Sequence, residues 1–365
     1  MSMVNEVSKP SRKVETTVVP GIKGKLGGAT YGRKNFGTAN RQMDAAAETR
    51  DRAQGTHGGS SPAVSLVVPC FNGGRFLDPL MASLARQTLP DFEIIIVDDG
   101  STDEATRRKL EAVEGRARIV RQENRGLSAA RNAGIAVARS ECVAVLDCDD
   151  TFEPAFLEEA AVLMRAAPAD VALVFSHLRL TGAGKGLIAR HFNAFDLLFA
   201  NTLHSGLMLR KACWRAVGGY DETMRQGYED WELYLRLAHA GYRGIEIPKP
   251  YFNYAVTGGG MLFNKSSQQH AVLWRTMRRK HARLYRPMAL LKLWRRERGN
   301  SRISLAKGML ALTMAVLLPD GVYSRMMAER RRRMLLEGHL PEYSGQAQDQ
   351  HKSDVAVAMR AAKQS

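Results

Sequence analysis

The sequence has few cysteines and no long apolar run. Its four cysteines, Cys70, Cys142, Cys148 and Cys213, form no CxxC pair, which excludes a disulfide scaffold and zinc-site spacing and is typical of a reducing compartment. The longest apolar run, from Gly308 to Leu318, is too short to cross a bilayer. Residues 1 to 20 lack the apolar core of a secretory signal. We therefore expect a cytoplasmic protein.

Acidic residues are also scarce relative to basic ones. The 365 residues include 37 Asp and Glu against 53 Lys and Arg, which gives a formal net charge of +16. A charge this far from neutral predicts an anionic partner or surface. With 45% hydrophobic residues, the chain has room for one large α/β domain with appendages or for two modest domains.

The two ends of the chain read as tails. Residues 1–62 are rich in Gly, Ser, Thr, Lys and Arg and have no sustained apolar periodicity, so we expect a disordered basic N-terminal tail. Residues 341–365 are expected to be disordered as well. Between the tails, the pattern predicts a globular domain over 63–265 and a basic helical extension over 266–340.

From Val64 onward, buried strands alternate with helices. Strands are predicted at 65–69, 93–97, 118–122, 141–146, 171–175 and 206–209, and helices at 76–84, 104–113, 127–138, 154–167, 211–217 and 231–240. This alternation predicts an α/β fold with a mostly parallel sheet and helices on both faces. In such folds, ligands bind beyond the carboxyl ends of the strands.

Acidic residues follow two of these strands and begin a later helix. Asp147, Asp149 and Asp150 stand at the end of an apolar strand, where they would repel one another unless a cation lay between them. Oxygen ligands of this kind suit Mg2+ or Mn2+, and such a metal commonly also binds nucleotide phosphates. An acidic turn with a helix cap explains the stretch equally well. Glu229 and Asp230 open a helix, where capping is again the simpler explanation.

The blocks that carry these features occur in a recognisable order. They are 67–72, Gln87 with Thr88, 92–103, 124–134, 146–150, 217–221 and 228–233. Together they resemble the family 2 glycosyltransferases of the GT-A fold, over roughly residues 63 to 262. This resemblance implies an inverting enzyme of hexosyltransferase type, which moves a sugar from a nucleotide-sugar, commonly a UDP-sugar, to an acceptor hydroxyl.

The resemblance also assigns roles to residues. Donor binding would fall to Pro69, Asn72, Asp99, Asn124, Arg131 and Asp147, metal binding to Asp149 and Asp150, and catalysis to Asp230 as general base beside Glu229. The chemistry agrees, because a divalent ion neutralises a leaving diphosphate and a carboxylate takes the acceptor's proton. Repulsion from its neighbour could raise the pKa of one acid of this pair, or an arginine could pair with it. Both alternatives stay open here.

Two later segments extend the comparison. Residues 251–254 and the glycines at 258–260 resemble the family loop that closes over donor and acceptor, although a flexible connector is an equal alternative. Within 266–340, many arginines accompany an apolar face made of Trp274, Leu290, Leu291, Leu293 and Trp294. A basic amphipathic helix of this kind predicts contact with an anionic membrane. The alternative is that this stripe packs onto the domain.

The expected function is therefore sugar transfer in envelope or exopolysaccharide synthesis, with Mn2+ or Mg2+ as cofactor. The expected partners are a nucleotide-sugar donor, a saccharide or lipid-linked acceptor and the inner face of the plasma membrane, and no nucleic acid. One alternative is a sugar nucleotidyltransferase, which would need a Gly-rich Arg/Lys loop where 71–75 stands. Another is an inactive GT-A-like module that binds an anionic membrane or polymer.

Overall fold

The computed structural model describes residues 61–256 and 269–336, with side chains up to residue 330. The two predicted tails fall almost wholly outside the described residues, and so do the glycines at 258–260. The predicted domain boundary after residue 265 also lies there.

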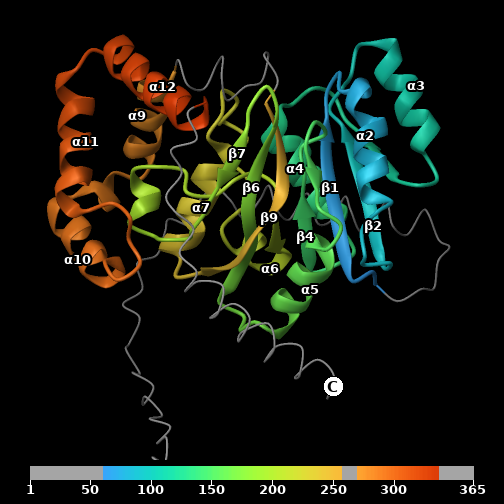
Figure 1. Ribbon diagram of the computed structural model, residues 1–365, viewed down its shortest axis with the longest axis horizontal. Coiled ribbons are helices and arrows are strands. Elements are labelled where there is room, and N and C mark those ends of the chain that lie inside the picture. The colour runs from blue at the N-terminus through green and yellow to red at the C-terminus, as the bar shows by residue number, and fades with distance from the viewer. Residues whose placement is uncertain (1–60, 257–268, 337–365) are drawn as a thin grey trace, which may run out of the picture.

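One twisted sheet forms the centre of the molecule (Figure 1). Its strands are β1 (Val64–Cys70), β2 (Phe92–Asp98), β3 (Arg118–Arg121), β4 (Cys142–Val145), β5 (Thr151–Phe152), β6 (Val171–Gly182), β7 (Gly186–Ile188), β8 (Leu207–Arg210) and β9 (Arg243–Val256). They lie in the order β3-β2-β1-β4-β8-β6-β9-β5, and β7 pairs with β6. The ladders among β1 to β4 are parallel, as is the long ladder between β6 and β9. The shorter ladders of β5, β7 and β8 are antiparallel.

Helices cover both faces of the sheet. They are α2 (Gly74–Leu84), α3 (Glu104–Val113), α4 (Leu127–Val137), α5 (Phe156–Ala166), α6 (Lys211–Ala216), α7 (Glu229–His239), α9 (His270–Lys280), α10 (Pro287–Glu297), α11 (Leu305–Leu317) and α12 (Asp320–Leu336), with 3-10 turns at Asp196–Leu198 and Ala282–Tyr285. Apolar side chains of α2, α3 and α5 pack on one face, and those of α4, α6 and α7 on the other. The predicted α/β fold is confirmed.

The local sequence explains these elements well. Every residue of β1 is buried, because it has a strand on each side and helices on both faces, and its apolar run is therefore continuous. The acidic loop after β2 starts α3 with Asp103 as the cap, whose Oδ1 accepts a hydrogen bond from the Thr106 N–H at 2.7 Å. Asp103 is thus the N-cap of the helix predicted at 104–113.

One predicted loop is wrong. Tyr251–Tyr254 belongs to strand β9, where it pairs with β6 in parallel register. The sequence hides this strand because Pro248 and Pro250 interrupt it, and proline normally argues against a central strand. Both prolines fall where the register shifts, between the pair Ser176 and Ile247 and the pair Leu178 and Phe252.

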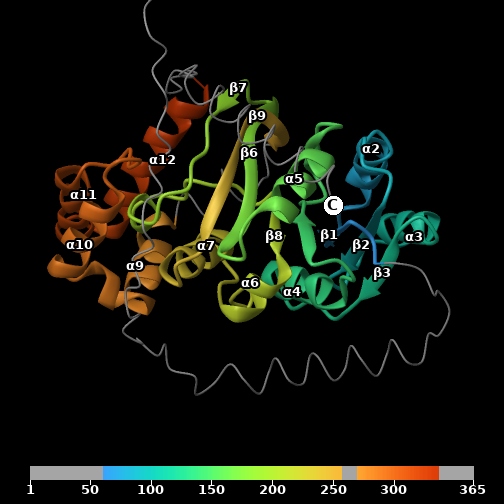
Figure 2. The same ribbon diagram turned by 90° about the horizontal axis from the view of Figure 1, so that it is seen from below.

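The C-terminal helices α9 to α12 pack beyond α7, at the opposite end of the molecule from α3 (Figures 1 and 2). Trp274 of α9 is 1% exposed, and its Nε1 donates to the Leu198 carbonyl at 3.0 Å. Leu290 and Leu293 are buried in the same core. The prediction that these three side chains face a membrane is wrong, because they pack against the domain instead. No helix in the described part of the chain is long and apolar enough to cross a bilayer.

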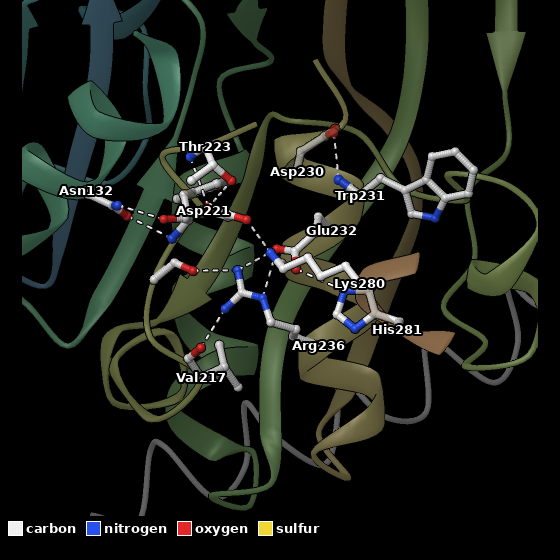
Figure 3. Close-up of polar contacts among 12 residues, drawn as sticks. Asn132, Val217, Asp221, Thr223, Asp230, Trp231, Glu232, Arg236, Lys280 and His281 are labelled. Atoms are coloured by element: carbon white, nitrogen blue, oxygen red, sulfur yellow. Dashed lines mark hydrogen bonds and ion pairs between the residues drawn. The ribbon is translucent and has the colours of Figure 1, made fainter. Parts of the chain in front are cut away.

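A buried polar cluster fastens α9 to α7. The Glu232 carboxylate is fully buried and contacts Arg236 Nε at 2.8 Å, Lys280 Nζ at 2.6 Å and His281 Nε2 at 3.0 Å (Figure 3). Burial alone would raise the pKa of Glu232, but the His281 hydrogen bond and the charges of Arg236 and Lys280 hold it well below its usual range. The helices after residue 268 therefore share both core and charge pairs with the sheet domain.

This packing predicts a stability effect. Trp274→Ala should lower the free energy of unfolding by about 3 to 5 kcal/mol, because a large buried side chain leaves a cavity. Chemical denaturation of the full chain measures this, with Trp294→Ala, at a half-buried position, as the control that loses less. An unchanged main unfolding transition in Trp274→Ala would contradict the shared core and would favour a separately folding extension.

Candidate active site

The acidic loops meet at the carboxyl edge of β1, β2 and β4, and a buried arginine joins them. Arg131, in the second turn of α4, is 1% exposed. Its Nη2 lies 2.7 Å from Asp147 Oδ1 after β4, and its Nη1 lies 2.7 Å from Glu229 Oε1 at the start of α7. Burial would lower the pKa of Arg131, but the charges of Asp147 and Glu229 raise it well above its usual value. A permanent cation therefore connects the two acidic segments that the sequence places 82 residues apart.

Asp99, which the resemblance assigns to donor binding, is buried and holds the neighbouring loop. Its Oδ1 accepts hydrogen bonds from Gln122 Nε2 at 2.7 Å and the Arg125 N–H at 2.9 Å, and its Oδ2 accepts from the Gly126 N–H at 2.8 Å. These bonds hold the segment that leads into α4. A carboxylate can accept about four hydrogen bonds, and the described residues supply three of them.

Asn72 joins the loops after β1 and β2. Its backbone is left-handed, with φ of 52°, a conformation that asparagine tolerates better than most residues. Its Oδ1 accepts from the N–H groups of Thr102 at 2.8 Å and Asp103 at 3.2 Å, and its own N–H donates to Ser101 Oγ at 3.0 Å. Asn72, which the resemblance assigns to donor binding, therefore holds the loops after β1 and β2 together.

The other two predicted donor-binding residues have different surroundings. Pro69 is buried in β1 beside Val97, so it contributes to the sheet. Asn124 is exposed and stands next to Gly100, where φ is 75° and a Cβ atom would lie 2.7 Å from the Asn124 nitrogen. This close approach requires glycine at position 100.

Two of the acids after β4 have raised pKa values. Burial and the neighbouring Asp147 raise the pKa of Asp149 to about 6. Asp150 is buried, and burial followed by the charges of Asp149 and Asp147 raises its pKa well above the usual value. Its Oδ1 accepts from the Ala255 N–H at 2.8 Å, while its Oδ2 has no hydrogen-bond partner among the described residues.

This donor set fits a divalent cation. A bound cation would favour the ionised form of both acids and would give the buried Asp150 Oδ2 a partner. Within 61–256 and 269–336, no three His, Cys, Asp or Glu residues gather as a complete metal cage. Mg2+ commonly needs only one or two protein carboxylates when substrate phosphates supply the remaining ligands.

The two acids at the start of α7 differ in their partners. Glu229 is buried, and burial raises its pKa to about 7 although the Arg131 charge opposes this. Asp230 is half-buried, and its Oδ2 accepts from Asn201 Nδ2 at 2.9 Å. No cation lies within ion-pair distance of Asp230 in the part of the chain that the structure describes. The arginine that the sequence left open thus pairs with Glu229 and not with Asp230.

Figure 3 shows Asp230 and the Glu232 cluster on different sides of α7. Asp230 points away from the Glu232 cluster, because residues two apart on a helix lie on nearly opposite sides. Arg236 of that cluster also donates to the carbonyls of Val217 and Gly219, at 2.5 and 2.6 Å. The cluster therefore fixes α7 to the turn that precedes it, while Asp230 faces elsewhere.

Sequence reasoning missed two supporting residues. Asn132 is buried next to Arg131, and its side-chain amide exchanges hydrogen bonds with the backbone of Tyr220, at 2.8 and 2.9 Å. Its place in the block 124–134 was visible, but its role was not. Asn201, which contacts Asp230, lies in a region without periodicity, and no sequence signal marks it.

Known proteins resemble this chain in sequence. Residues 65–213 match the family model described as Glycosyl transferase family 2. YwdF of Bacillus subtilis (strain 168), named as an uncharacterized glycosyltransferase, is 31% identical over 204 residues, which cover 54% of this chain and 75% of YwdF. The chondroitin synthase of Escherichia coli is 29% identical over 187 residues, which cover 49% of this chain. The chain spans only 27% of the length of that synthase.

The fold also has counterparts among solved structures. The crystal structure of S. aureus TarS 1-349 in complex with UDP-GlcNAc superposes with a TM-score of 0.52 at 18% identity, covering 75% of this chain and 90% of that chain. At this identity the similarity shows a shared GT-A type of fold.

The Arg131 bridge predicts a large stability effect. Arg131→Met should lower the free energy of unfolding by about 3 to 5 kcal/mol, because it leaves two carboxylates without their buried cation. Arg125→Met is the matched control, since that exposed arginine pairs with Glu222 at 2.7 Å and should cost at most about 1 kcal/mol. Urea denaturation at neutral pH compares the two.

Adding Glu229→Gln to Arg131→Met should recover part of the loss, because the double variant removes one of the unpaired charges. Equal losses in Arg131→Met and Arg125→Met would show that the bridge is not a principal support.

Proposed function

We propose, because this chain belongs to glycosyl transferase family 2, that it transfers a sugar from a UDP-sugar to an acceptor hydroxyl with inversion at the anomeric carbon. The observation that carries the proposal is the Arg131 bridge, which brings the acids after β4 and the acids of α7 to one edge of the sheet. An inverting displacement needs a site for the leaving diphosphate and a base for the acceptor at such a short separation.

The donor side of this site would be built from three loops. Asp99, Asn72, Pro69 and Asn124 would surround the base, and Asp147 with Arg131 would contact the sugar-phosphate part of the nucleotide. The TarS structure of similar fold is in complex with UDP-GlcNAc, which favours a UDP-sugar as the first donor to test.

Asp149 and Asp150 would hold a divalent cation, Mn2+ or Mg2+. The raised pKa of each carboxylate and the unpartnered Asp150 Oδ2 support this assignment. Such an ion neutralises the charge that develops on a diphosphate leaving group.

Asp230 would act as the general base. Its half-buried carboxylate can take the proton of the acceptor hydroxyl as that oxygen attacks the anomeric carbon. Asn201 would orient it through the 2.9 Å hydrogen bond. Glu229 is held by Arg131, so we assign it to positioning, next to the base.

The wider context is also a proposal. The similarity to a chondroitin synthase favours a saccharide acceptor in polysaccharide synthesis of the cell envelope, free or linked to a lipid. Residues 63–265 would form the catalytic unit and 266–340 its helical extension. The net charge of +16 favours peripheral association with the anionic inner face of the plasma membrane.

A calorimetric titration tests the donor site. UDP, GDP and dTDP are each titrated with and without Mn2+, and we expect one of them, UDP, to bind only with the metal. Asp149→Ala should weaken this binding at least about 10-fold, because the metal loses a charged ligand. Asp78→Ala, on the exposed face of α2, is the control with the same change of charge. Absence of metal-dependent binding by all three nucleotides would favour the inactive anion-binding module.

The rate of donor turnover tests the base. Asp230→Asn should slow the release of UDP from the matching UDP-sugar by about 100-fold or more, since it removes general-base catalysis. The Kd for UDP with Mn2+ should stay unchanged, because Asp230 lies on the acceptor side. Asn201→Ala should show a smaller rate loss with the same Kd. A normal rate in Asp230→Asn would move the base assignment to another residue.

A further inference from the structure

Helix α11 exposes large apolar side chains on the side that faces away from the domain. Its thirteen residues, Leu305–Leu317, include no acid and one charged residue, Lys307. Only its small residues Gly308 and Ala315 are buried. Gly308 packs so closely that a Cβ atom would lie 2.7 Å from the Phe199 ring. Leu305, Leu312 and Met314 also pack, half-buried, against the core. The helix therefore contacts the domain along one side and leaves the other side exposed.

The outward side chains form one apolar stripe. Met309, Leu310, Val316 and Leu317 are 42%, 58%, 73% and 74% exposed, and their spacing of one, seven and eight residues places them on one face of the helix. Ala306 and Thr313, also exposed, complete this face without adding a charge. A surface helix normally buries its large apolar side chains, so this stripe marks an interaction surface.

The neighbouring helices also expose apolar side chains. Met288 of α10 and Val322 and Met326 of α12 are 63%, 50% and 40% exposed. Both helices contact α11. In Figures 1 and 2, α11 lies at the outer edge of the molecule, away from the sheet. Nothing in the described part of the chain covers this side.

Exposed cations accompany the apolar surface. In the segment 286–330, the exposed basic residues are Arg286, Lys292, Arg295, Arg296, Arg298, Arg302, Lys307, Arg325 and Arg330. Glu329 is the exposed acid of that segment. Of the two half-buried acids, Asp320 pairs with Arg275 and Glu297 with Arg296. The segment thus combines bare apolar side chains with a large excess of positive charge.

These two properties together select the partner. A second copy of the chain could cover the apolar stripe, but it would bring two strongly cationic segments together, and like charges at an interface oppose association. A bilayer with anionic headgroups accepts apolar side chains at its acyl boundary and attracts the surrounding cations. We propose that α11 docks this protein on an anionic phospholipid bilayer, with Met309, Leu310, Val316 and Leu317 entering the interface.

This inference deepens the proposed membrane association and moves it to a different surface. The sequence predicted contact through Trp274, Leu290 and Leu293, which the fold buries. Docking through α11 does not depend on the identity of the donor, and α11 contains none of the residues proposed for donor binding or catalysis. Vesicle binding and nucleotide binding can therefore fail separately.

Co-sedimentation of the full chain with lipid vesicles tests the docking surface. We expect binding to phosphatidylcholine vesicles that contain phosphatidylglycerol, and weak binding to phosphatidylcholine alone. The triple variant Leu310→Asp, Val316→Asp, Leu317→Asp should bind the anionic vesicles at least about 10-fold more weakly, because buried charges oppose insertion. Leu187→Asp, at an exposed leucine of β7, is the control and should bind like the wild type.

Two further measurements separate the outcomes. Metal-dependent nucleotide binding by the triple variant shows that it is folded. If the stripe inserts, the tryptophan fluorescence of Val316→Trp should be quenched by lipids brominated on the acyl chain. Undiminished vesicle binding by the triple variant would overturn the proposal in favour of charge-only adhesion. A concentration-dependent dimer that the triple variant abolishes, with no quenching of Val316→Trp, would overturn it in favour of a second copy.

Discussion

The site depends on one buried cation, the guanidinium of Arg131, between the carboxylates of Asp147 and Glu229. Charges that leave water are tolerated in a protein interior only when they are paired. Without this arginine, the acids after β4 and those of α7 would repel each other at the same edge of the sheet. The arginine also fixes where α4 must lie, and Asp99 holds the loop that leads into that helix. The separate acidic loops are therefore parts of one arrangement.

The residue next to Arg131 carries the arrangement further. Asn132 binds the backbone of Tyr220, and Arg236 ties the same turn to Glu232 on α7. Glu232 in turn contacts Lys280 and His281, which lie at the end of helix α9. Hydrogen bonds and ion pairs thus connect the loops at the carboxyl edge of the sheet with the C-terminal helices. These contacts fasten α7 on the side away from Asp230.

The C-terminal helices use their apolar residues in two opposite ways. Trp274 of α9 completes the core beside α7, whereas Met309, Leu310, Val316 and Leu317 of α11 remain exposed. Both helices contain many apolar residues and have arginines nearby. The difference lies in which side each helix presents to the domain. For a glycosyltransferase whose acceptor is proposed to be a saccharide or a lipid-linked saccharide, an exposed apolar surface at the edge of the fold is a useful property.

The sequence by itself determined the alternation of strands and helices from Val64 to α7, except for β5, β7 and β9, and the gathering of acids at one sheet edge. These features follow from local periodicity, from short-range hydrogen bonds and from the direction of parallel strands. Tertiary structure decided the pairing of Arg131 with Glu229, the contact of Asn201 with Asp230, the proline-interrupted strand β9 and the outward face of α11. Each of these depends on residues far apart in the chain, and a contact of that kind has an energy only after the fold has brought both partners together.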